Sequence, residues 1–168
     1  MFKLRELERE DVNTINQWRN DASLIACLGA PYRFINGEVD KAWYEQYMHS
    51  RNNTVRCVIV DDNNTVLGLI SLVNINYINR SAELHIMIGD SENRGKGIGT
   101  FAVKSMVDHA FLNLNLHRIE LGVLENNYPA IRLYEKTGFV KEGIKRESHY
   151  KNGEYVNMIM MGLLNTDC

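Results

Sequence analysis

One glycine-rich turn limits what this chain can fold into more than any other feature. It follows an apolar run, Leu84–Ile88, that predicts a strand, and it precedes apolar residues at helical spacing between Val103 and Leu114. Such a turn presents free backbone N–H groups at the positive end of a helix dipole, and its glycines let the backbone approach a ligand closely. The sequence therefore predicts an anion site, most naturally for phosphate, at Arg94, Gly95, Lys96, Gly97, Ile98, Gly99 and Thr100.

Three known phosphate loops compete for this turn. A Walker A loop places a Ser or Thr after its Lys, whereas Gly97 follows Lys96 here. A dinucleotide fingerprint fits Gly97–Ala102 literally, but it should follow its strand at once inside a βαβ unit, and the upstream chain predicts an antiparallel meander. The spacing of Arg94, Gly97 and Gly99 resembles instead the coenzyme A pyrophosphate loop of the Gcn5-related N-acetyltransferase (GNAT) superfamily, Gln/Arg-x-x-Gly-x-Gly/Ala.

A second motif carries the same resemblance. Asn127, Ala130, Tyr134, Gly138 and Phe139 match the superfamily's signature Asn-x-x-Ala-(x3)-Tyr-(x3)-Gly-Phe. The local chemistry agrees, because Asn127 suits a helix N-cap and Gly138 suits the position just beyond a helix C-terminus. With two matching motifs at a compatible separation, the chain resembles GNAT enzymes over nearly its whole length.

The expected elements follow the order βααβββαβαββ. This is the order of the acetyltransferase fold, so the resemblance implies an α/β (α+β) architecture, a mixed, mostly antiparallel central sheet of about seven strands with helices on both faces. The 168 residues suffice for a single N-acetyltransferase domain, residues 1–168. The expected strands are 2–7, 54–61, 65–75, 81–88, 117–123, 139–150 and 154–163, with helices after Asp11, Asn36, Gly97 and Asn127 and an Asn-Gly hairpin turn at 152–153.

Composition argues against several function classes. A net charge of −2 gives a nucleic-acid partner no electrostatic support, and no apolar run is long enough to span a membrane. The three cysteines, Cys27, Cys57 and Cys168, are odd in number and lack the spacing of a metal site. We therefore expect reduced thiols in a cytoplasmic protein without a signal peptide, and a homodimer is compatible with the sequence.

The resemblance implies acetyl-CoA as cosubstrate, no metal, and direct attack by a primary amine in a ternary complex. It places Tyr134 beside the coenzyme sulfur as general acid. Glu83, on the strand that enters the turn, is the expected general base or water-positioning group, with His85 and His149 as alternatives. A solvated carboxylate or an ion pair with Arg80 would be the purely structural interpretation of Glu83. The expected coenzyme contacts are Ile86, Met87, Ile88, Asn127 and the seven residues of the turn.

The sequence leaves the acceptor open. Segments around Asn74–Glu83 and Asn152–Tyr155 resemble spermidine N-acetyltransferases, but Gly29–Arg33 lacks the carboxylates of their polyamine-binding segment. The Trp18-Arg19-Asn20 run resembles aminosugar-nucleotide N-acetyltransferases, and the general layout resembles ribosomal-protein-alanine N-acetyltransferases. A non-catalytic acyl-CoA-binding module and, with less support, a nicotinamide-dependent oxidoreductase are the alternative functions. The residues expected to contact the acceptor are Arg19, Tyr32, Glu83 and Tyr150.

Overall fold

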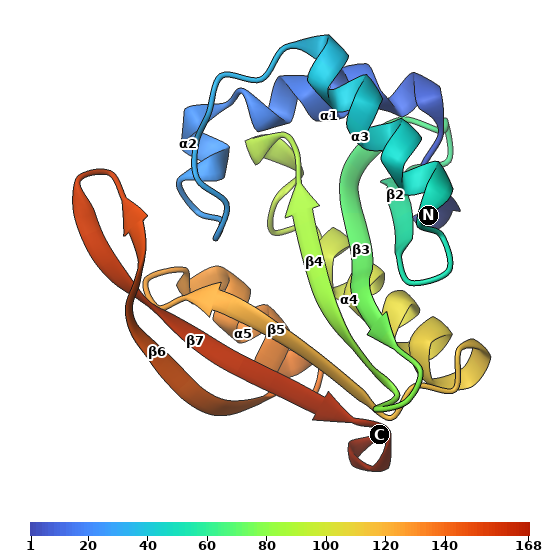
Figure 1. Ribbon diagram of the computed structural model, residues 1–168, viewed down its shortest axis with the longest axis vertical. Helices are drawn as coiled ribbons and strands as arrows, with labels where there is room; N and C mark the ends of the chain where they lie inside the picture. Colours follow the sequence, from blue (N-terminus) through green and yellow to red (C-terminus); the bar gives the residue numbers. More distant parts are fainter.

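A seven-stranded sheet with helices on both faces organises the molecule (Figure 1). The computed structural model describes all residues, 1–168, and its strand order is β1-β2-β3-β4-β5-β7-β6. All neighbouring strands are antiparallel except β4 and β5, so the expected fold class and element order are confirmed, with one short helix added. The strands are β1 (Lys3–Glu6), β2 (Val55–Val60), β3 (Val66–Asn76), β4 (Ser81–Ile88), β5 (Arg118–Leu124), β6 (Val140–Lys151) and β7 (Glu154–Leu164). The α-helices are α1 (Val12–Arg19), α2 (Ala22–Ile25), α3 (Gly37–His49), α4 (Ile98–Asp108) and α5 (Tyr128–Lys136).

Two hydrophobic cores lie on opposite faces of this sheet. The larger one joins β3, β4 and β5 to α4, and Leu84 and Met106 belong to it. The smaller one joins the sheet to α1, α2 and α3, and contains Trp18 and Met87. Because side chains alternate along a strand, Glu83 shares the face of Met87 and points toward α1–α3. Trp18 is a buried residue of the smaller core, and a side chain on Gly89 would collide with its ring.

The parallel pair β4–β5 is short, and this opens the sheet. Pairing runs only from Ser81–Glu83 to the matching residues Arg118–Glu120. Beyond Glu83 the two strands diverge, as Figure 1 shows, while β5 stays paired with β7 as far as Leu124. The edge of β4 that faces β5 therefore has unpaired backbone groups from Leu84 onward.

Local geometry agrees with most sequence signals but differs at the start of α1 and at the end of α4. Asn152 and Gly153 have φ values of +52° and +89°, which confirms the hairpin turn. Asp11 does not cap α1 through its side chain, because its carboxylate accepts hydrogen bonds from Arg5 and from the Glu8 N–H instead. The long helix after the turn is α-helical only to Asp108. It ends in a π-helical segment, His109–Asn113, where the Leu114 N–H bonds to the His109 carbonyl.

Three short 3₁₀ turns, Arg9–Asp11, Ser91–Asn93 and Asn165–Asp167, complete the chain. All three cysteines are free thiols, as expected. None of the helices has the length and hydrophobicity that a bilayer crossing requires.

Candidate active site

A cleft of about 1230 Å³ opens where β4 and β5 diverge. Its walls come from strands β2 to β7, from α1, α2 and the loop that follows, from Trp43 of α3, from the N-terminal end of α4, and from α5 as far as Lys136. Most of the predicted site residues line this one cavity, among them both candidate catalytic groups. The lining residues predicted from the sequence are Arg19, Glu83, Ile86, Met87, Ile88, Arg94, Gly95, Gly97, Ile98, Gly99, Thr100, Asn127 and Tyr134.

The glycine-rich turn has the geometry of an anion site. Gly95 and Gly97 have φ values of +75° and +84°, in the left-handed region that favours glycine. The backbone N–H groups from Gly95 to Thr100 have no acceptor within the chain, and Arg94 stands beside them. Six donors in succession at the start of α4 suit a pyrophosphate. Lys96 is exposed and lies outside the cleft lining.

A close helix contact fixes this turn in place. A Cβ atom on Gly99 would lie 3.0 Å from Leu133 Cδ2, so α4 and α5 approach each other closely there. The glycine-rich turn and the helix that carries Tyr134 are therefore in direct packing contact.

The second motif holds Tyr134 in its position. Asn127 Oδ1 accepts a hydrogen bond from the Ala130 N–H at 3.3 Å and so caps α5, while its Nδ2 donates to the Cys27 carbonyl at 2.9 Å. At the other end, Gly138 has φ +100° and the Phe139 N–H bonds to the Tyr134 carbonyl at 3.0 Å, which is a Schellman motif. Both ends of the short helix are thus fixed.

Tyr134 is a protonated donor inside the cleft wall. Its side chain is 7% exposed, its ring packs edge-on against Phe139 with centroids 5.9 Å apart, and its hydroxyl has no hydrogen-bond partner in the chain. Burial raises the pKa of Tyr134 to about 12. The hydroxyl therefore keeps its proton at neutral pH and can donate it to a group bound in the cleft.

Glu83 stands at the point where the two strands part. Its side chain is 42% exposed, so its carboxylate is only partly shielded from water. Asn74 Nδ2 donates to Glu83 Oε1 at 3.1 Å, and His85 Nε2 lies 3.5 Å from Oε2. The ion pair with Arg80 does not form, because that guanidinium bonds to Asn115. Asn74, at a β3 irregularity with φ +52°, thus orients the candidate base.

Arg19 lines the cleft, but an acid already neutralises it. Its guanidinium pairs with Asp40, whose side chain is fully buried and also accepts from Asn16 Nδ2 at 2.8 Å. Arg19 lies 5.8 Å from the centre of the Trp43 ring. The sequence analysis missed Asp40, because an acid in the first turn of a helix is ordinary and only the tertiary contact distinguishes it.

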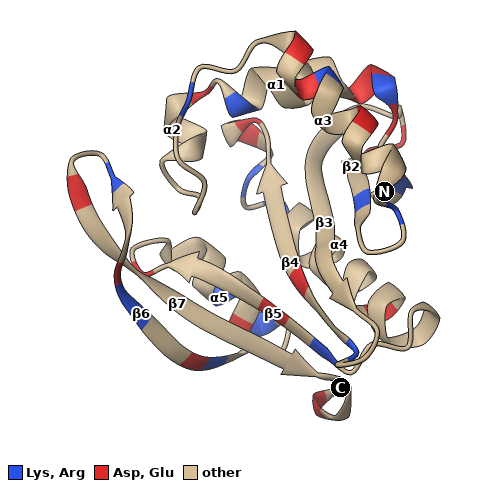
Figure 2. Ribbon diagram, in the orientation of Figure 1, with Lys and Arg blue, Asp and Glu red and all other residues tan.

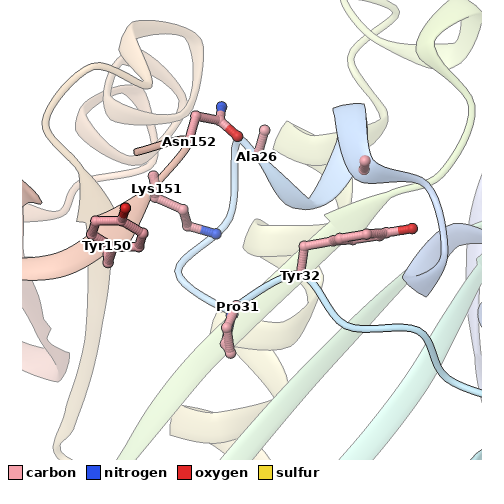
Figure 3. A pocket seen from close by; sticks show the side chains of 7 residues that line it. Ala26, Pro31, Tyr32, Tyr150, Lys151 and Asn152 are labelled. Atoms are coloured by element: carbon pink, nitrogen blue, oxygen red, sulfur yellow. The ribbon is translucent and has the colours of Figure 1, made fainter. Parts of the chain in front are cut away.

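Tyr32 and Tyr150 lie elsewhere. They line a smaller pocket of about 250 Å³ with Lys151 between them (Figure 3). Tyr32 donates to the Asn20 carbonyl at 3.2 Å, and Tyr150 packs against Tyr155 with ring centroids 5.2 Å apart. The structure therefore does not bring these two tyrosines into the cleft of Tyr134 and Glu83. Their expected contact with the acceptor has no geometric support.

The cleft also contains basic side chains that the motifs did not indicate. They come from strands and helices far apart in the sequence, so no local pattern could have found them. Arg132 and Lys136 lie on α5, Arg56 on β2 and Lys145 on β6.

Comparison with known proteins agrees with this geometry. Residues 2–140 match the family model described as acetyltransferase (GNAT) domain. The chain is 36% identical over 164 residues to the spermidine N(1)-acetyltransferase of Vibrio cholerae serotype O1, covering 97% of this chain and 92% of that protein. It is 31% identical over 125 residues to a putative ribosomal N-acetyltransferase of Bacillus subtilis, covering 74% of this chain and 66% of that one.

Solved structures show the same likeness. The spermidine N-acetyltransferase of Vibrio cholerae in complex with CoA and spermine has a TM-score of 0.93 at 34% identity, over 99% of this chain and 96% of that one. A dodecameric structure of spermidine N-acetyltransferase from the same organism has a TM-score of 0.85 at 33% identity, over 98% and 94% of the two chains. The chain therefore belongs to the GNAT acetyltransferase family and is an acetyl-CoA-dependent N-acetyltransferase.

Proposed function

We propose that this enzyme acetylates a primary amine by direct attack in a ternary complex, with Tyr134 as the acid and Glu83 as the base. One observation carries the proposal: the anion-binding turn, the unpaired edge of β4, Tyr134 and Glu83 all line the same cleft. A coenzyme thioester and an amine can therefore meet within it. One cysteine, Cys27, lines this cleft, and its sulfur donates to the Ser23 carbonyl, so direct attack by the amine needs no acyl-enzyme.

The coenzyme binds along the diverging strands in this proposal. Its pyrophosphate accepts hydrogen bonds from the free N–H groups of Gly95–Thr100, next to Arg94. Its pantetheine arm lies along β4 and pairs with the free backbone groups of Ile86–Ile88. The thioester then reaches Tyr134, because α5 is packed against the turn through Leu133.

The reaction itself is a nucleophilic substitution at the thioester carbonyl. Glu83, directly or through a water, accepts the proton that the amine must lose. The amine nitrogen forms a bond to the carbonyl carbon, and the C–S bond then breaks. Tyr134 donates a hydrogen bond to the departing sulfur, which leaves as a thiolate. The thiolate takes up the second proton, which the nitrogen of the tetrahedral intermediate releases, so the products are coenzyme A thiol and an amide.

A screen of acceptors tests this function. Purified enzyme is incubated with acetyl-CoA and spermidine, N-terminal peptides or aminosugar nucleotides, and thiol release and product mass are measured. The names of its relatives make spermidine the first acceptor to try. We expect at least one amine to gain a single acetyl group. Tight coenzyme binding without turnover on any amine would favour a non-catalytic acyl-CoA-binding module, and thermal protection by NAD but not by acetyl-CoA would favour an oxidoreductase.

We also propose that the chain associates with copies of itself, as a homodimer or a larger oligomer. The support is the dodecameric structure of a relative that covers nearly the whole chain. Light scattering on the purified protein checks this, and a monomer at micromolar concentration would contradict it. A cytoplasmic location stays a prediction from the cysteine pattern.

A further inference from the structure

Positive charge gathers in the cleft although the chain as a whole is acidic. Among the side chains that line it, Glu83 is the only carboxylate, against Lys or Arg at six positions. The net charge of the chain is −2, so this imbalance is local. Figure 2 marks basic residues on α1, β2 and β6, three elements that border the cleft. The six basic residues are Arg19, Arg56, Arg94, Arg132, Lys136 and Lys145.

The proposed coenzyme site accounts for half of these charges. Arg94 belongs to the anion-binding turn. Arg132 and Lys136 are four residues apart on α5, so they share one face of the helix, on one side of Leu133, which packs against Gly99 of the turn. These three cations therefore lie at the phosphate end of the cleft.

Arg56 lies at the other end, on the face of the sheet that carries Glu83. In the sheet register Arg56 pairs with Ser71, and Ser71 pairs with His85. Paired residues of antiparallel strands share a face, so this row points toward α1–α3 like Glu83, two residues before His85. Neighbouring strands are about 4.8 Å apart, which puts the Arg56 Cα about 10 Å from that of His85.

Arg56 is a half-buried cation without an acid. Its Nη1 donates to Ser71 Oγ at 3.2 Å, its Nε is buried without any partner, and no carboxylate lies within 4.0 Å. The Trp43 and Tyr47 rings lie 4.9 and 5.9 Å from the guanidinium carbon. Burial and the nearby Arg19 lower its pKa from the ordinary value. A charge held out of water without a counter-ion is unfavourable, so the fold keeps Arg56 here at a cost.

The aromatic contacts do not replace a counter-ion for Arg56. A cation over a ring contributes about 0.5–2 kcal/mol and satisfies none of the in-plane N–H donors. The buried acid Asp40 is occupied by Arg19 and Asn16. Lys145, on the β6 side of the opening, also has no acidic partner. A polycation entering here would meet like charge, whereas an anion would find unsatisfied donors.

We propose that the preferred acceptor is a primary amine that also carries an anionic group, a carboxylate or a phosphate, which Arg56 binds while Glu83 accepts the proton of the amine. This rests on the proposed amine acetylation and adds the chemical class of the acceptor. Arg56 is then a substrate-binding residue that selects among amines, and the bond-forming step is unchanged.

A matched set of linear alkylamines tests the class directly. All share one chain length and end in a phosphate, a carboxylate, a methyl group or a second ammonium. We expect the wild-type kcat/KM to be about tenfold or more higher for an anionic amine than for the methyl-ended one, and lowest for the diamine. The two anionic amines separate a phosphate preference from a carboxylate preference. Higher efficiency with the diamine or spermidine would overturn the inference and leave amine acetylation standing.

Variants assign the preference to one residue. Arg56→Gln should raise KM for the anionic amine about tenfold to a hundredfold and leave KM for acetyl-CoA unchanged. Arg33→Gln removes the same charge from an exposed position outside the cleft and should change neither. Equal losses with all four amines in Arg56→Gln would refute the assignment. If that variant does not fold, the wild-type order of the four amines decides alone.

Binding separates this inference from the reaction. If no amine is acetylated, the proposed function fails, and calorimetry on the protein saturated with coenzyme A still decides the inference. The phosphate-ended amine should then bind more tightly than the methyl-ended one. Equal binding of the two would overturn the anionic acceptor.

Discussion

Replacing Tyr134 by Phe removes one hydroxyl and tests the proposed chemistry most directly. The hydroxyl bonds to nothing in the chain, and the ring is held by burial and by Phe139. Loss of the oxygen therefore leaves the packing intact, and the free energy of unfolding should change by less than about 0.5 kcal/mol. Coenzyme affinity should stay the same, because the glycine-rich turn proposed to bind the pyrophosphate is untouched.

The size of the kinetic effect follows from the two pKa values involved. Burial raises the pKa of Tyr134 to about 12, and a thiol has a pKa of about 8.5, so full proton transfer to the thiolate is uphill by roughly 5 kcal/mol. Tyr134 acts mainly as a hydrogen-bond donor to a sulfur that is becoming negative. Such a bond contributes about 1.5–3 kcal/mol, so kcat should fall about 10-fold to 150-fold.

The pH dependence adds a second criterion. Since the raised pKa keeps the phenol protonated, the ratio of wild-type to Tyr134→Phe kcat should stay constant from about pH 6 to about pH 10. Steady-state kinetics at saturating acetyl-CoA and acceptor measure it. Tyr128→Phe is the control, because Tyr128 lies on the same helix, is exposed and does not line the cleft. Wild-type kcat in Tyr134→Phe would show the tyrosine to be structural, and a ratio that falls toward one by pH 10 would refute the protonated-donor role.

Three further substitutions test the rest of the site. Gly97→Val should weaken acetyl-CoA binding about tenfold. The cause would be backbone strain at φ +84° and not a steric clash, because a Cβ at Gly97 meets no atom within 4 Å. Gly143→Val, at an ordinary φ and equally free of contacts, is the calorimetric control, and equal losses of affinity in the two variants would refute the phosphate-turn assignment. Glu83→Gln should lower kcat/KM about 10²- to 10⁴-fold and remove the acid limb of the pH–rate profile; an unchanged profile would point to another base. Arg19→Ala should lower the free energy of unfolding, measured in urea, by about 3 kcal/mol, because it leaves the buried Asp40 without its counter-ion. Adding Asp40→Asn should restore part of this loss. Wild-type stability of the single variant would contradict the Arg19–Asp40 pairing.

Local chain geometry made the coenzyme half of this site readable in the sequence. The turn around Gly97 and the helix from Asn127 to Gly138 depend on caps, positive φ values and spacing within a few residues, and the structure confirms each of them. Alternation along β4 likewise placed Glu83 on the correct face before any coordinates. Caps, turns and strand alternation depend on residues close in the chain, so they can be predicted from local sequence patterns.

The acceptor half shows the opposite case. Tyr32 and Tyr150 were expected from their residue type to contact the acceptor, yet packing places them in a separate pocket. Arg19 is in the cleft, but a buried acid from another helix neutralises it.

By itself, the sequence determined the element order, the glycine-rich turn, the helix that carries Tyr134 and the strand face that carries Glu83, because each depends on contacts near in the chain. Only the tertiary structure decided where the sheet opens and which charges line the cleft. Pairing between β4 and β5 stops after Glu83. Arg56 and Lys145 line the cleft from β2 and β6, and they lie nearly ninety residues apart in the sequence. The net charge of a cavity is a sum over such distant side chains, so no local pattern records it.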